Sequence, residues 1–156
     1  MRVLGKIMIT ITIQGLDKLV DRFPKYTEKL KDELDGALKT SIMIVEAESK
    51  KNAPKDTGKL MRSHKVEFGY LKASLIPMAE YAECVHEGTR PHFPPIEPIE
   101  NWARRKLGKT GLGYVIARKI AQKGTKPNPF LRKAAENKKR EVVAIFVEAV
   151  KRVVKL

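Results

Sequence analysis

The chain has 156 residues, of which 42% are hydrophobic and 32% are charged, and its formal net charge is +14. This length suits a single domain over residues 1–156, and the apolar content excludes a disordered chain. One cysteine, Cys84, excludes an intrachain disulfide framework. Charge interrupts residues 1–6 too early for a signal peptide, and the longest apolar run, 142–147, is far shorter than a membrane span. We therefore expect a soluble protein with no membrane partner.

Two alternating or periodic segments dominate the first half of the chain. Isoleucine occupies every second position within residues 6–14, which predicts a half-buried strand. A helical stretch follows Gly15 and runs to residue 23. Over residues 27–51 an apolar residue recurs every three or four positions from Leu30 to Val45, which predicts a long amphipathic helix.

The middle of the chain predicts a β-hairpin and then a proline-rich loop. Alternation from Leu60 and a turn at Gly69 predict the hairpin over 60–77. A short helix over 79–87 ends at a glycine, and a loop with four prolines covers 88–98.

The last third is predicted to be helical and basic. A helix over 99–107 carries the only tryptophan, and a Gly/Lys-rich loop leads to a basic helix over 114–123. A final helix over 129–154 has a wide apolar face that must be buried in the core or against a neighbouring subunit. The sum is an α+β fold, in which a small antiparallel sheet of about three strands packs on the long helix beside a C-terminal basic helical part.

One phrase occurs twice, 36 residues apart. Gly88-Thr89-Arg90-Pro91-His92-Phe93-Pro94 is echoed by Gly124-Thr125-Lys126-Pro127-Asn128-Pro129-Phe130, and each copy follows a predicted helix end. Glycine after a helix and proline just beyond it stop the helix. Two interpretations are open: a pair of unrelated helix stops, or two rigid basic loops that present backbone and charge to a partner.

The sequence offers little for catalysis or for metal binding. Cys84, His86 and His92 have a spacing that matches no usual pair of zinc ligands, and they are one short of the four in a structural site. Cys84 and His86, two apart on a helix, point away from each other. No nucleotide-binding loop, zinc-protease motif or hydrolase elbow occurs. We expect no enzyme, no metal and no cofactor.

The net charge is concentrated in the last third. Residues 103–156 hold 16 Lys/Arg against 3 Asp/Glu, whereas residues 1–102 hold 16 against 15. This asymmetry predicts an anionic partner, with a merely solvated basic face as the alternative. Phosphate contacts require only cations on one surface, and aromatic residues are too sparse for base stacking. The predicted surface facing DNA or an acidic partner comprises Arg104, Arg105, Lys106, Lys109, Arg118, Lys119 and Lys123.

Three phrases occur in an order that resembles a known family. They are Ala53-Pro54-Lys55-Asp56-Thr57-Gly58-Lys59-Leu60-Met61-Arg62-Ser63, Glu80-Tyr81-Ala82-Glu83-Cys84-Val85-His86-Glu87-Gly88-Thr89-Arg90-Pro91 and Gly124-Thr125-Lys126-Pro127-Asn128-Pro129-Phe130-Leu131-Arg132-Lys133-Ala134. The chain resembles the minor tail-component family of long-tailed bacteriophages, also called neck, tail-completion or head–tail joining proteins. The resemblance covers residues from about 40 to 140 and leaves the first 25 outside. His86 lengthens the second phrase, and Lys133 stands where proline is common.

The resemblance implies a non-enzymatic structural subunit of a virion or provirus. Its members would form a hexameric or dodecameric ring at the head–tail junction, assembled in the host cytoplasm. Neighbours would be connector, tail-terminator or tail-tube proteins, and packaged double-stranded DNA could pass through the channel. The alternative is a small basic protein that binds nucleic acid without sequence specificity. The predicted contacts with a subunit or a neighbouring ring are Thr89, Arg90, Pro91, Phe93, Thr125, Lys126, Pro127 and Phe130.

Overall fold

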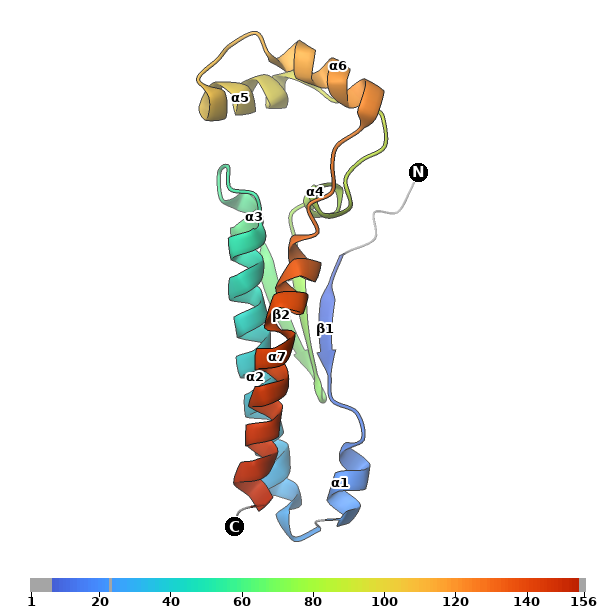
Figure 1. Ribbon diagram of the computed structural model, residues 1–156, viewed down its shortest axis with the longest axis vertical. Helices are drawn as coiled ribbons and strands as arrows, with labels where there is room; N and C mark the ends of the chain where they lie inside the picture. The colour runs from blue at the N-terminus through green and yellow to red at the C-terminus, as the bar shows by residue number, and fades with distance from the viewer. Residues whose placement is uncertain (1–6, 23, 155–156) are drawn as a thin grey trace.

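The computed structural model describes residues 7–22 and 24–154, and Figure 1 shows two long helices beside a sheet, with a helical arm beyond one end. Residues 1–6, for which we expected no signal peptide and which include Lys6 of the predicted strand, lie outside the described part. Phe23 of the predicted first helix also lies outside it. None of the described helices is both long and apolar enough to cross a membrane.

Two long helices form one layer. Helix α2 (Thr27–Asn52) buries the apolar side expected from its periodicity, with Leu38 and Ile42 almost fully buried. Helix α7 (Phe130–Val154) runs along α2 and starts one residue later than predicted. Its Arg152 pairs with Glu33 of α2 at 2.8 Å. The mutual burial of the two apolar faces holds the layer together.

The second layer is a three-stranded antiparallel sheet. Strands β1 (Ile9–Thr12), β2 (His64–Gly69) and β3 (Lys72–Pro77) lie in the order β1-β3-β2, with Leu75 of the central strand opposite both Ile9 and Val66. β3 is buried from Ala73 to Pro77 because it has a neighbour on each edge and contacts α2. The alternation predicted for β1 is confirmed, since its isoleucines pack on the core and the residues between them are exposed.

Short helices connect the layers. These are α1 (Leu16–Arg22), the 3-10 turn η1 (Pro24–Tyr26), α3 (Lys59–Arg62) and α4 (Ala82–Glu87). The predicted hairpin began at Leu60, which is wrong for its first residues, because Lys59–Arg62 form a helical turn and the strand begins at His64. Gly58, at φ 77°, ends the preceding turn and starts that helix. Leu60 is buried as a helical residue, so its apolar character mimics a strand position.

The arm consists of α5 (Ile96–Leu107) and α6 (Gly113–Lys123). Helix α5 begins three residues before the predicted start, so the proline-rich loop is shorter than 88–98. Pro98 falls in the first turn of α5, where its missing N–H has no helical partner to lose. The two helices pack on each other through Ala103 and Ala117, which are fully buried.

Candidate assembly site

The two copies of the repeated phrase meet each other. Thr89 and Thr125 form an isolated antiparallel bridge, in which each N–H donates to the carbonyl oxygen of the other residue, at 3.3 and 3.1 Å. Their side-chain hydroxyls lie 3.0 Å apart and share a further hydrogen bond. We call Gly88, Thr89, Gly124 and Thr125 the Gly-Thr clamp.

The clamp requires glycine at both of its glycine positions. Gly88 and Gly124 end α4 and α6 with φ of 74° and 68°, in the region that L-residues avoid. A Cβ on Gly88 would lie 2.5 Å from the carbonyl oxygen of Thr125, and one on Gly124 would overlap the carbonyl oxygen of Thr89. Each glycine therefore ends its own helix and also leaves room for the backbone of the other phrase.

The clamp closes the base of the arm. The chain leaves the body after Thr89, forms α5 and α6, and returns through Thr125 into the start of α7. Figure 1 shows the two connecting segments side by side between the arm and the body. A pairing between residues 36 positions apart thus fixes where the arm emerges.

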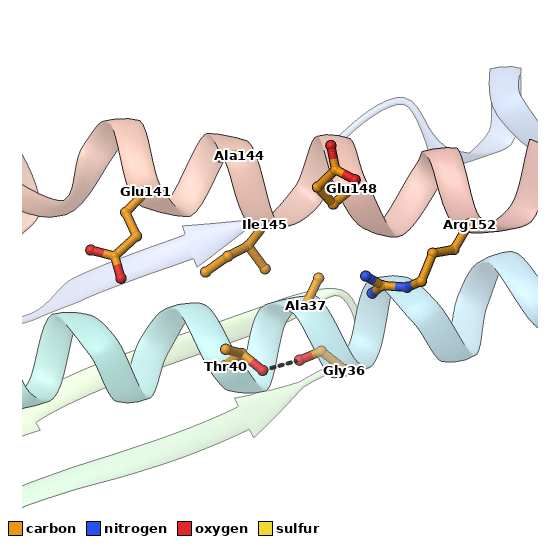
Figure 2. Close-up of a pocket in the computed structure, with 8 residues that line it drawn as sticks. All are labelled: Gly36, Ala37, Thr40, Glu141, Ala144, Ile145, Glu148 and Arg152. Atoms are coloured by element: carbon orange, nitrogen blue, oxygen red, sulfur yellow. Dashed lines mark hydrogen bonds between the residues drawn. The ribbon is translucent and has the colours of Figure 1, made fainter.

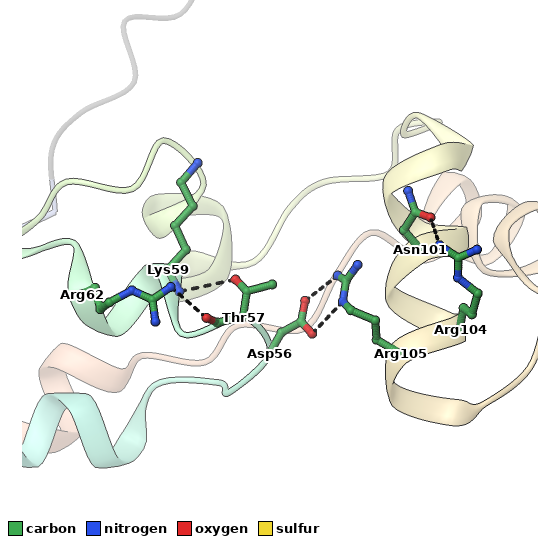
Figure 3. A network of polar contacts seen from close by, with 7 residues as sticks. All are labelled: Asp56, Thr57, Lys59, Arg62, Asn101, Arg104 and Arg105. Atoms are coloured by element: carbon green, nitrogen blue, oxygen red, sulfur yellow. Dashed lines mark hydrogen bonds and ion pairs between the residues drawn. The ribbon is translucent and has the colours of Figure 1, made fainter.

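A second contact joins the tip of the body to α5. The Arg105 guanidinium donates two hydrogen bonds to the Asp56 carboxylate, from Nη2 at 2.7 Å and from Nε at 3.3 Å (Figure 3). The hydrogen bonds between the two side chains lower the pKa of the Asp56 carboxyl group and raise the pKa of the Arg105 guanidinium. Both side chains are partly exposed, so solvent screens the pair and limits its strength. We call it the Asp56–Arg105 latch.

The turn that carries Asp56 is held by its own residues. Arg62 donates from Nη2 to the backbone oxygen of Thr57 at 2.9 Å, and the Lys59 N–H donates to the Thr57 hydroxyl at 3.4 Å (Figure 3). The Asp-Thr-Gly phrase of the sequence therefore serves as the body's docking point for the arm.

The arm has an internal brace at its loop. The Glu100 carboxylate accepts the N–H groups of Gly111 and Gly113, at 2.5 and 2.6 Å. These backbone donors lower the pKa of Glu100. They also satisfy N–H groups at the start of α6 that no helical carbonyl reaches. The Gly/Lys-rich loop between α5 and α6 is thus tied to α5.

The latch gives a pH-dependent prediction. Trp102, the only tryptophan, lines the same cavity of about 300 Å³ as Asp56. Because the folded-state pKa of Asp56 is depressed, the latch is present above the ordinary aspartate pKa of about 4 and is lost as the pH falls through the lower folded value. We expect Trp102 emission to shift in that acid range, and Asp56→Asn to show the shifted emission already at neutral pH.

The control for this prediction is Asp32→Asn, which removes an exposed carboxylate of α2. It should leave the neutral spectrum and the acid step unchanged. Identical neutral spectra for the wild type and Asp56→Asn would contradict the latch.

The predicted assembly residues separate into three groups. Thr89 and Thr125 bind each other in the clamp. Phe130 has no exposed surface, so its side chain belongs to the core and not to an outer contact. Phe130 lies between the rings of His86 and His64, with centroids at 5.4 and 6.0 Å. The residues of the set that remain exposed are Arg90, Pro91, Phe93, Lys126 and Pro127.

The predicted basic surface falls on the arm. All seven of its residues are exposed and lie on α5, on α6 or in the loop between them. Arg105 is engaged by Asp56, and Arg104 donates to the side-chain oxygen of Asn101 at 3.1 Å.

The residues tested as metal ligands lie in different settings. Cys84 is half-buried on α4, and the buried His86 shares a hydrogen bond of 2.7 Å with Glu87. His92 is exposed, with Nδ1 2.9 Å from the carbonyl oxygen of Arg90. No cluster of three possible metal ligands occurs within residues 7–22 and 24–154.

Sequence reasoning missed an open groove between the long helices. It lies between α2 and α7 (Figure 2). Its volume is about 430 Å³. Its lining residues are Gly36, Ala37, Thr40, Glu141, Ala144, Ile145, Glu148 and Arg152. The apolar face predicted for α7 is only partly covered, because Ala149 and Val153 are buried while Val143 is 54% exposed. The small residues Gly36, Ala37 and Ala144 were the available signal, since they leave room between helices.

Comparison with known families gives one match. The HK97-gp10-like family model, described as "Bacteriophage HK97-gp10, putative tail-component", matches residues 17–88. The match confirms the predicted resemblance to phage tail components. That description is of a structural component of a phage tail, and the matched residues make up less than half of the chain. No curated protein and no solved structure matches the chain.

The extent of this tail-component match differs from the expected coverage. We expected the resemblance to begin near residue 40 and to exclude the first 25 residues. Both expectations are wrong, because the match begins at residue 17. The match runs from α1 through α2, the β2–β3 hairpin and α4, and it ends at Gly88, the first residue of the clamp. The arm and the second Gly-Thr copy lie outside the matched residues.

Proposed function

We propose that the protein is a ring-forming neck or tail-completion subunit at the head–tail junction of a tailed phage or provirus. The family match over residues 17–88 carries this proposal. A hexameric or dodecameric ring would stand against connector, tail-terminator or tail-tube proteins, after assembly in the host cytoplasm. No catalytic role is part of the proposal.

The surface of the subunit supports repeated contacts of the ring type. A closed ring needs two different patches on each subunit that fit each other head to tail. The exposed valines of α7, Val143 and Val147, supply an apolar patch on the body. The loops that flank the clamp supply a second surface, with proline-stiffened backbone and the exposed cations Arg90 and Lys126.

The decisive experiment is native mass spectrometry of the full chain together with negative-stain imaging. We expect closed rings of one copy number. A species that stays monomeric, alone and when mixed with connector or tail-tube proteins, would overturn the proposal.

A paired substitution tests the body patch. Val143→Ser with Val147→Ser removes apolar surface from one helical face, so we expect the ring to dissociate toward monomer at a given concentration. The shift in dissociation constant should be about thirtyfold, since each of the two valines buried at an interface contributes about 1 kcal/mol. Native mass spectrometry across a dilution series measures this shift.

The matched control is Tyr70→Ser. Tyr70 is 81% exposed at the turn between β2 and β3, far along the chain from both proposed patches. It should leave the ring intact. Equal dissociation by both variants would show that the α7 patch has no special role.

A further inference from the structure

The outward face of α6 is exposed along the whole helix. Gly113 and Ala117 are buried against α5, whereas Tyr114, Val115 and Arg118 are exposed. Lys119 and Gln122 continue the same exposed face. Residues four apart on a helix are neighbours, so Tyr114 lies next to Arg118, and Val115 next to Lys119.

Three apolar side chains gather at the start of this face. Tyr114 and Val115 are 57% and 60% exposed, and Phe93, 56% exposed, contacts Tyr114 with ring centroids 6.2 Å apart. A single exposed apolar side chain is ordinary in a soluble protein, but a contiguous group marks a contact surface. We call Phe93, Tyr114, Val115, Arg118 and Lys119 the α6 outer patch.

The two cations of the patch, Arg118 and Lys119, form no ion pair within the described residues. Other arginines of the chain have carboxylate partners, such as Arg105 with Asp56 and Arg152 with Glu33. The charge of Arg118 and Lys119 is therefore available to a partner.

We propose that the α6 outer patch binds an acidic protein surface that also presents apolar side chains. Arg118 and Lys119 pair with its carboxylates, while Phe93, Tyr114 and Val115 cover its apolar residues. Charge complementarity of this kind steers association and fixes orientation. The inference adds a partner to the proposed assembly role and rests on that role.

Charge disfavours a second copy of the chain as the partner of the α6 outer patch. Residues 90–126 carry nine Lys/Arg and two Asp/Glu, a net charge of +7. The rest of the chain carries 23 and 16, which is also +7. Docking of the α6 outer patch on another copy would bring like net charges together, which weakens that association relative to docking on an acidic protein. A different, acidic protein is therefore the favoured partner.

The apolar part of the patch argues against DNA. Backbone phosphates are bound by cations and polar donors, and a duplex offers no apolar surface at the phosphates to cover three exposed apolar side chains. A surface for phosphate alone would carry polar residues at positions 114 and 115.

The arm presents the patch away from the body. Figure 1 shows α5 and α6 beyond the end of the sheet and of α2, opposite the C-terminus. The clamp and the latch hold the arm there. A partner can therefore reach α6 without displacing the α2–α7 layer.

The test measures binding of the full chain to three fluorescent probes. These are a random copolymer of glutamate and tyrosine, polyglutamate of similar length, and a short blunt DNA duplex. We expect the glutamate–tyrosine copolymer to bind most tightly. Arg118→Glu with Lys119→Glu should weaken it by about tenfold, because two cation contacts become repulsive.

The matched control is Lys139→Glu with Arg140→Glu. This is another adjacent pair of exposed cations on a helix, and its reversal changes the net charge by the same amount. It should change copolymer affinity by less than about threefold, since only the long-range field is altered. Tyr114→Ser with Val115→Ser should weaken the copolymer and leave polyglutamate binding unchanged.

Two outcomes overturn the inference. Equal losses from the two charge reversals would show a general polycation effect without a patch. Tighter binding of the duplex than of the copolymer, unaffected by Tyr114→Ser with Val115→Ser, would show a phosphate surface. Either result can occur while the chain still forms rings, so the inference can fail without the proposed function failing.

Discussion

Gly124→Ala is expected to open the Gly-Thr clamp. Alanine at φ 68° and ψ −163°, a region adopted essentially by glycine alone, costs about 1–3 kcal/mol, and its Cβ overlaps the carbonyl oxygen of Thr89. The overlap is relieved only by separating the two strands, which removes two backbone hydrogen bonds with a net worth of about 1 kcal/mol each. We expect a total loss of about 3–5 kcal/mol in the free energy of unfolding, or of clamp opening if the arm separates on its own.

Hydrogen exchange of the backbone amides distinguishes these two results. In Gly124→Ala the Thr89 and Thr125 N–H groups should lose their protection from exchange. The arm would then no longer be held in its position on the body. If only the clamp opens, the amides of α2 keep their protection. If the whole fold is affected, the melting temperature falls by roughly 10 °C.

Gly108→Ala is the matched control. Gly108 also ends a helix at positive φ, but its ψ of 19° is left-handed helical, whereas Gly124 has ψ −163°, and nothing lies within 4 Å of the Cβ that Gly108 would gain. It should therefore cost only about 1 kcal/mol, from the backbone conformation alone. Equal costs for the two substitutions would mean that the clamp adds nothing to a helix stop.

Phe130→Ala is expected to be the most destabilising substitution in the second phrase. The ring has no exposed surface and packs between His64 and His86. Burial lowers the pKa of His64, which favours the neutral form of that neighbouring ring. Truncating a buried phenylalanine leaves a cavity and costs about 3–5 kcal/mol. Urea unfolding followed by circular dichroism measures this loss.

Phe93→Ala is the matched control from the first phrase. Phe93 is 56% exposed, so its truncation should change the free energy of unfolding by less than about 0.5 kcal/mol. If Phe130→Ala lowered the free energy of unfolding as little as Phe93→Ala, the Phe130 side chain would be an outer contact, as the sequence suggested, and not part of the core.

The prediction for the repeated phrase shows the reach of sequence reasoning. The glycines are helix stops, as predicted, with positive φ at the ends of α4 and α6. That the two stops bind each other had no sequence signal beyond the repetition itself. The phrases differ in order after the shared proline, and this difference places Phe130 in the core while Phe93 stays exposed.

The periodic elements were predicted to within a few residues where one face alone is buried. The long helix was expected over 27–51 and is found at Thr27–Asn52, and the C-terminal helix was expected over 129–154 and is found at Phe130–Val154. The error at Leu60 arose because four residues are too few to separate a helical turn from alternation.

Local patterns by themselves determined the helices, the alternation of β1, the helix stops and the basic arm, because burial of one face imposes a period on the sequence. Only the tertiary structure decided the strand order β1-β3-β2, the Asp56–Arg105 latch and the pairing of Thr89 with Thr125. Each of these joins residues distant along the chain. Such contacts form when larger surfaces are buried, and they leave no spacing in the sequence from which they could be read.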